Sequence, residues 1–200
     1  YDDVLRKQRE IMYAERNEVL ENEVVTDIVY EMIDEAVEKT IQYASQTMGE
    51  VHSEREETEE IIKSINEKFL GQNPITELEY GDVMSDEEIK ELTIAKIKAE
   101  LQEKRDLLGD DTMNSFEKYI LLNAIDDRWT DHIDQMDQLR KGIFLRSYGQ
   151  IDPLREYKNE GHEMFEYMID DIQVEVVTNL MRIRVERHEE IEMKQEPTNL

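Results

Sequence analysis

The sequence predicts an all-α fold, and three observations support this prediction. Apolar residues recur at three- and four-residue steps over long stretches, which is the spacing of one helix face. Helix breakers are rare, since the 200 residues contain 7 Gly and 3 Pro. Runs that alternate apolar and polar residues, as half-buried strands do, are few. We therefore expect a long helix, a small peripheral helical subdomain and a long antiparallel two-helix hairpin.

The first segment, residues 1–46, is predicted to be one long helix. Its apolar side chains keep a helical spacing from Val4 to Ile41. A helix of about 40 residues would be about 60 Å long at a rise of ~1.5 Å per residue, which suits a strut better than a compact bundle. The polar residues Glu21, Asn22 and Glu23 interrupt the stripe, and the helix could kink or restart there.

The middle segment, residues 47–112, is broken by glycines and is rich in acidic residues. Two shorter helices are expected, near residues 53–69 and 86–107. The second begins after Ser85, with Glu88 three residues later, which is the pattern of a capping box. The acidic run in the first of these helices is expected to be a solvated face rather than a cation site.

The third segment, residues 113–188, carries two apolar stripes that predict the helical hairpin. Asp152 can cap the second helix, and Pro153 can occupy its first position, where a missing N–H costs nothing. Residues 189–200 are expected to begin a linker. The side chains expected to pack the hairpin are Trp129, Ile133, Met136, Leu139, Met164, Phe165 and Met168. Trp129 could pack between the hairpin helices or against a further helix.

The connection between the hairpin helices, residues 142–157, is the most informative stretch for function. Surface loops are usually small and polar, because apolar groups gain nothing from contact with water. This one contains Phe144, Leu145, Arg146 and Tyr148. Such a loop is either buried in its own fold or contacts something else. For Tyr148 both readings stay open: an exposed residue that makes a contact, or a tyrosine that holds the loop on its own helices.

Charge is distributed unevenly along the chain, whose net charge is −26. Residues 1–112 contain 13 basic and 31 acidic side chains, whereas residues 138–158 contain five basic and two acidic ones. An acidic body argues against nucleic acid as a partner, because phosphates require clustered Lys and Arg. The basic tip suggests a partner of its own, although helix C-termini favour cations and that alone would account for Arg140 and Lys141.

Motifs for catalysis are absent from the sequence. There is no phosphate-binding loop, no dinucleotide motif and no His-Glu-x-x-His, and there is no cysteine. His132 lies among aspartates, but helical spacing spreads them around a polar face. We expect a solvated flank that pairs with Arg128 and Arg140, not a metal site. No catalytic residue, metal or cofactor is therefore predicted, and the chain is not expected to be an enzyme.

The sequence also bears on the cellular compartment of the protein and on whether the chain is part of a larger one. The lack of cysteine favours a reducing compartment. No stretch approaches the ~18 apolar residues of a membrane span, and no secretory signal opens the chain. The chain starts without Met, inside a helical pattern, so we expect a piece of a larger protein.

The chain opens with Tyr1–Val4 and Gln8–Glu10, and the hairpin carries a long and specific pattern. The residues of that pattern are Arg128, Trp129, Asp131, His132, Ile133, Asp134, Met136, Asp137, Gln138, Leu139, Arg140, Leu145, Arg146, Tyr148, Gln150, Pro153, Leu154, Glu156, Tyr157, Glu160 and Gly161. The pattern resembles SecA, the motor ATPase of bacterial preprotein export, and the opening residues resemble the start of that family's long scaffold helix.

The resemblance implies a C-terminal piece of such a motor. Residues 1–46 would be the long helix of the helical scaffold domain, and residues 47–112 the helical wing domain. Residues 113–188 would be the two-helix finger, also described as the intramolecular regulator of ATP hydrolysis, and residues 189–200 the start of the C-terminal linker.

The resemblance also implies partners and a tip. In the family the finger enters the cytoplasmic mouth of the SecY channel, and a tyrosine at its tip contacts the translocating preprotein. The matched positions here are Leu145, Arg146, Tyr148 and Gln150. The scaffold helix would pack on the parent's nucleotide-binding and peptide-crosslinking domains, which are not in this chain. ATP and Mg²⁺ would bind in those missing parent domains. The implied location is cytoplasmic, and peripheral at the plasma membrane.

Two other functions fit the same stripes less specifically. The chain could be a non-enzymatic helical scaffold or adaptor that binds partner helices, which a parent sequence without upstream ATPase motifs would favour. A metal-dependent helical-bundle enzyme ranks last.

Overall fold

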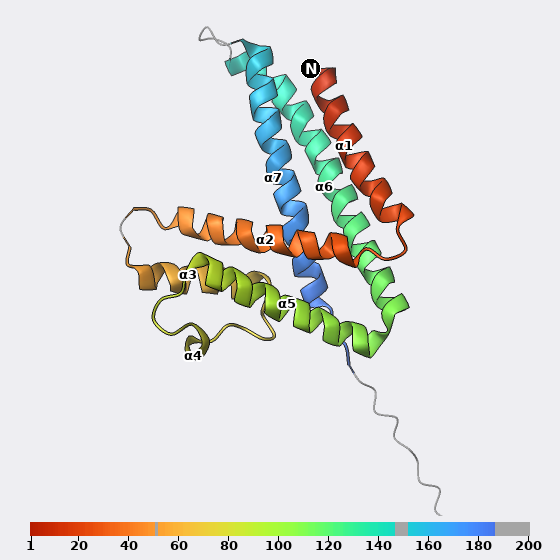
Figure 1. Cartoon of the computed structure of the whole chain (residues 1–200). Helices are drawn as coiled ribbons and strands as arrows, with labels where there is room; N and C mark the ends of the chain where they lie inside the picture. Colours follow the sequence, from red (N-terminus) through yellow and green to blue (C-terminus); the bar gives the residue numbers. More distant parts are fainter. Residues whose placement is uncertain (51, 147–151, 187–200) are drawn as a thin grey trace, which may run out of the picture.

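The computed structural model describes residues 1–50, 52–146 and 152–186, and these form seven helices and no strand. The predicted all-α class is confirmed. Figure 1 shows three long helices side by side along one axis. These are α1 (Asp2–Glu21), α6 (Asp110–Arg146) and α7 (Pro153–Arg182).

The other four helices form an arm that crosses the long axis. In Figure 1, α2 runs across α7, and α3 and α5 lie alongside α2. Their bounds are α2 (Thr26–Thr47), α3 (Glu54–Lys68), α4 (Glu77–Tyr80) and α5 (Asp86–Leu108). The expected helices near residues 53–69 and 86–107 are therefore present as α3 and α5. The capping box of Ser85 and Glu88 is present as well, and Ser53 and Glu56 form a second one at α3.

The single long helix expected over residues 1–46 is wrong. The chain leaves helical geometry at Asn22, whose φ of −90° and ψ of 129° are extended, and restarts as α2 after Val25. The side chain of Asn22 donates to the carbonyl of Glu18, and Lys118 of α6 donates to that of Leu20 (3.2 Å). The Leu20 carbonyl would have been bonded within a continuing helix, and Lys118 takes that place, whereas the Glu18 carbonyl also keeps its helical bond from the Asn22 N–H at 3.3 Å. The break therefore falls within the polar interruption.

Burial explains why the chain turns at this break. Val25 is fully buried, and α2 buries an apolar face from Val29 to Ala44. A straight continuation of α1 would not bring this face onto α7, α3 and α5, which α2 contacts. The apolar area removed from water stabilises the bent arrangement at ~25 cal/mol per Å². Because α2 packs on both the arm and the hairpin, the domain boundary after residue 46 stays a prediction.

The end of α7 is held by a buried lysine of the arm. Lys104 of α5 donates to the carbonyls of Leu180 (3.1 Å) and Met181 (3.0 Å), and it pairs with Glu100 at 2.9 Å. Its side chain is only 7% exposed. The last carbonyls of a helix lack donors within the helix and carry partial negative charge. A cation there supplies the hydrogen-bond donors and balances the charge. Lys104 thereby fixes the arm to the hairpin.

A second buried ion pair joins α2, α5 and α6. The Arg105 guanidinium donates to Glu117 at 2.7 Å and to the Thr26 hydroxyl at 3.0 Å, while that hydroxyl donates to Glu117 at 3.2 Å. Glu117 is 2% exposed. Satisfied on several sides, this pair sets where α2 starts relative to the other two helices.

Candidate functional site

The end of the hairpin that the sequence marks as functional is partly described. Phe144 and Leu145, in the last turn of α6, are 59% and 77% exposed. The predicted tip residues Tyr148 and Gln150 lie outside the described residues, as does the side chain of Arg146. On the described side, the hairpin therefore ends in large apolar groups that face solvent.

The entry into α7 has the predicted local chemistry. The Asp152 carboxylate accepts a hydrogen bond from the backbone N–H of Leu154 at 3.0 Å, and Pro153 occupies the first helical position. The side-chain oxygen satisfies one of the free N–H groups of the first turn, and the proline ring pre-sets the helical φ. This cap fixes where the connection ends and the rigid helix begins.

An aromatic and cationic cluster clamps the start of α1 to the base of the tip. The ring of Tyr1 meets that of Tyr157 edge-on at 4.8 Å and lies 6.1 Å from that of Phe144. The Arg140 guanidinium sits over the Tyr1 ring at 5.4 Å and donates to Asp2 at 3.0 Å. Burial raises the pKa of Tyr157. Helical spacing alone does not predict this cluster, because it needs a third helix beside the hairpin.

The predicted packing residues lie on the inner faces of α6 and α7. Trp129, Met136, Leu139, Phe165 and Met168 are buried. Ile133 and Met164 are partly buried and pack against the same clusters. Helix α1 covers the seam from a third side, since Val4 and Leu5 join the cluster that contains Met136. Three helices, rather than two, therefore make the rod stiff.

Gly161 allows the closest approach among these three helices. A Cβ built on Gly161 would lie 2.8 Å from Met136 Cε and 3.3 Å from its Sδ, with Val4 at 3.8 Å. The absence of a side chain thus lets α6 and α1 close on α7 at this point.

A buried polar chain crosses the same point and ties all three helices together. The Gln8 side-chain amide of α1 donates to the Gly161 carbonyl of α7 at 2.9 Å, and its oxygen lies 2.8 Å from His132 Nε2 of α6. Because an amide oxygen only accepts, Nε2 of His132 must carry the proton. Gln8 and His132 are 6% and 1% exposed. These bonds fix both the rotation and the axial position of α1 on the hairpin.

His132 therefore does not lie on a solvated flank, and that expectation is wrong. The centroid of its imidazole ring lies 5.6 Å from that of the Trp129 ring and 5.7 Å from that of the Phe165 ring. Burial lowers its pKa from 6.5 to about 4, and its Nδ1 is buried without a hydrogen-bond partner. A second proton on Nδ1 would be an unsatisfied buried donor, so the neutral ring is favoured.

Arg128 and Arg140 pair across helices rather than with the aspartates of the flank, whereas Asp137 pairs with Lys141 on the same helix. Arg128 donates to Glu175 of α7 at 2.6 Å, and Arg140 to Asp2 of α1. Asp126 accepts two bonds from Arg16 of α1, the shorter being 2.8 Å. Within the described ranges, no three metal-ligating side chains converge. The arrangement can hold the three helices together.

Two further findings bear on identity. In the part of the chain that the structure covers, none of the helices has the length and apolar character needed to span a bilayer. A family model described as the SecA Wing and Scaffold domain matches residues 1–184.

Proposed function

The chain belongs to the SecA wing and scaffold family, and from that premise we propose that it carries motor movement to a polypeptide in transit. It is part of a SecA-like translocase, in the wing and scaffold region rather than the nucleotide-binding region. In this proposal the α6–α7 hairpin is the moving finger, its tip contacts the polypeptide, and α1 links the hairpin to the motor domains.

The observation that carries the proposal is an exposed apolar end on a rod that is otherwise tightly held. Leu145 is 77% exposed, whereas the seam below it is buried and clamped by Gln8, His132 and Arg140. A side chain that must push or hold another molecule needs such support, because a flexible base would absorb the movement.

The chemistry of the tip fits a partner of changing sequence. Aromatic, aliphatic and guanidinium groups make contacts that depend little on the identity of the side chain they meet. A motor that moves unrelated polypeptides needs this tolerance. Leu145, Arg146 and Tyr148 supply such groups, and Gln150 adds a polar amide.

The partners follow from the same proposal. The finger tip would dock at the cytoplasmic mouth of the SecY channel and meet the preprotein there. The parent's nucleotide-binding and peptide-crosslinking domains would contact α1, and ATP and Mg²⁺ would bind in those domains. The chain would then act at the cytoplasmic face of the plasma membrane, as a peripheral component.

Replacing the tip tyrosine tests the polypeptide contact. Tyr148→Ala in the parent motor is expected to reduce transport of a secretory precursor into membrane vesicles, while this chain stays folded by circular dichroism. Tyr119→Ala is the matched control, because Tyr119 is also an exposed tyrosine on α6, 64% exposed, but lies at the far end of the helix. Equal transport by the Tyr148 variant and the parent would remove Tyr148 from the mechanism.

Charge reversal tests the channel contact. Arg146→Glu is expected to weaken binding of the parent to channel-containing vesicles, and more so at low salt, where charge attraction is less screened. Lys63→Glu on the exposed face of α3 makes the same change in net charge away from the tip. If both variants bind equally, a basic tip does not guide docking.

A further inference from the structure

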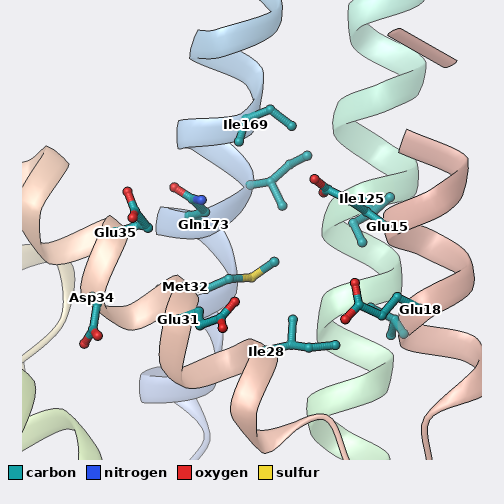
Figure 2. A pocket seen from close by; sticks show the side chains of 12 residues that line it. Glu15, Glu18, Ile28, Glu31, Met32, Asp34, Glu35, Ile125, Ile169 and Gln173 are labelled. Carbon is teal, nitrogen blue, oxygen red and sulfur yellow. The ribbon is translucent and has the colours of Figure 1, made fainter. Parts of the chain in front are cut away.

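A groove opens where α1 and α2 meet over the hairpin. Its volume is about 330 Å³. Figure 2 shows Glu15 and Glu18 of α1 on one side and Glu31 and Glu35 of α2 on the other. Between them lies an apolar floor from three helices, made of Ile28, Met32, Ile125, Ile169 and Ile172. The corner between α1 and α2, where the sequence left a kink or restart open, creates this groove.

The charges around the groove are all of one sign. Five carboxylates line it, those already named and Asp34, together with no Lys or Arg. Among the described residues, only Asp34 of these five has a cation within ion-pair distance, Lys98 at 4.0 Å. Glu15 is exposed, but partial desolvation in the groove and the neighbouring charge of Glu18 raise the pKa of its carboxyl group. An incoming cation would offset both the desolvation of the Glu15 carboxylate and its repulsion from Glu18.

A neighbouring groove shows that this pattern is not simply a result of the chain's acidity. It lies between α1 and α6 and is lined by Met12, Tyr13, Arg16, Asn17, Ile125, Asp126, Trp129 and Thr130. There the carboxylate of Asp126 is already paired with Arg16 at 2.8 Å. The first groove leaves its charge uncompensated on both flanks of an apolar floor.

We propose that the first groove is a docking site for a basic amphipathic helix of a protein partner. Apolar side chains of that helix would cover Ile125, Ile169 and Met32, and Lys or Arg on both edges of its stripe would meet the glutamates of α1 and α2. A helix with an apolar stripe bordered by cations has this arrangement of groups. A metal ion does not fit, because the carboxylates stand on opposite sides of the floor and no three ligating side chains converge among the described residues.

This inference does not rest on the proposed function of the hairpin tip. The groove lies on the α1–α2 corner, whereas the tip is the opposite end of α6, so each can fail alone. A partner helix seated here would contact α1 and α2 together and would therefore stabilise the angle between the hairpin and the arm.

A designed peptide tests the site on this chain directly. The probe is a helix of about 18 residues made of Leu, Ala and Lys, with Leu at helical spacing and Lys on both edges of the Leu stripe. Its binding is followed by methyl NMR of the isoleucines and by titration calorimetry. We expect shifts at Ile28, Ile125, Ile169 and Ile172, and weaker binding as salt rises. A peptide with Glu in place of Lys should not bind.

Variants with matched charge separate the groove from general attraction to an acidic protein. Glu15, Glu18, Glu31 and Glu35, all exposed, are changed together to Gln. The control changes four exposed glutamates outside the groove to Gln, namely Glu67, Glu91, Glu103 and Glu163. We expect the groove variant to lose about tenfold or more in affinity, since exposed ion pairs each contribute modestly, and the control less than about twofold.

Each outcome of these experiments either supports the proposed docking site or overturns it. Because all eight positions are exposed, both variants should keep the helical circular dichroism of the parent chain. Equal loss of affinity in both variants would show nonspecific attraction. Shifts centred on Ile143 at the tip would place the helix elsewhere. Either result, or no binding by the Lys peptide at low salt, overturns the proposal.

Discussion

Gln8 is the residue whose loss should reveal most clearly how α1 is held to the hairpin. Gln8→Leu keeps the size of the side chain but removes both bonds of the buried polar chain, to His132 Nε2 (2.8 Å) and to the Gly161 carbonyl (2.9 Å). The two losses are unequal. The Gly161 carbonyl can still accept within α7, whereas the N–H of His132 is left buried without an acceptor.

The expected cost can be worked out from these two groups. An unsatisfied buried donor costs about 1–3 kcal/mol, and the weaker second bond adds about 0.5–1.5 kcal/mol. The added apolar burial of Leu offsets part of this, so we expect a net loss of about 2 kcal/mol in the free energy of unfolding. Removing both partners is less harmful, so Gln8→Leu with His132→Phe should be more stable than the sum of the single changes predicts.

Urea unfolding followed by circular dichroism measures this loss, with the slope of the transition checked for constancy. Gln102→Leu is the matched control: the same change on an exposed face of α5, where only an exposed bond to Asp106 is lost. We expect it to shift stability by less than about 0.5 kcal/mol. If Gln8→Leu proves as harmless as the control, the buried chain does not hold α1.

Other consequences of the structure can be tested on the same chain. The pKa of His132 is about 4 when folded and 6.5 when unfolded, so its contribution to stability is complete above pH 6.5 and is lost as pH falls toward 4. Stability of the parent minus that of His132→Gln, measured by urea unfolding at several pH values, should fall over this window. Lys104→Met should cost about 3 kcal/mol, because it removes the cap of α7 and leaves Glu100 buried and unpaired, while Lys63→Met should be nearly neutral by the same urea assay. Leu145→Ser should change unfolding by less than about 0.5 kcal/mol yet reduce precursor transport by the parent motor; lost stability would mean that Leu145 packs in the fold instead.

The parts of the fold that follow from one helix at a time could be predicted. The stripes of α6 and α7, the Asp152 cap with Pro153, and the capping box of Ser85 depend on residues close in sequence. Helical spacing states which residues share a face, and capping states where a helix starts. These signals therefore located the hairpin and the two arm helices.

The parts that depend on a third helix could not be predicted. His132 lies beside aspartates on its own helix, so spacing alone assigned it to the polar side, but the approach of Gln8 on α1 buries it. Lys104 likewise looks like a surface lysine until the end of α7 is placed against it. The break at Asn22 had a local signal, but its direction comes from the burial of Val25 and α2.

The central claim is that a clamped rod presents its apolar and cationic end to a moving polypeptide. Site-specific photo-crosslinking from position 148 of the parent motor, during transport of a stalled secretory precursor, tests it most directly. Position 119, at the far end of α6, is the control. The account predicts crosslinks from 148 to the precursor and none from 119. Crosslinks from 148 that stay within the chain's own hairpin would contradict it.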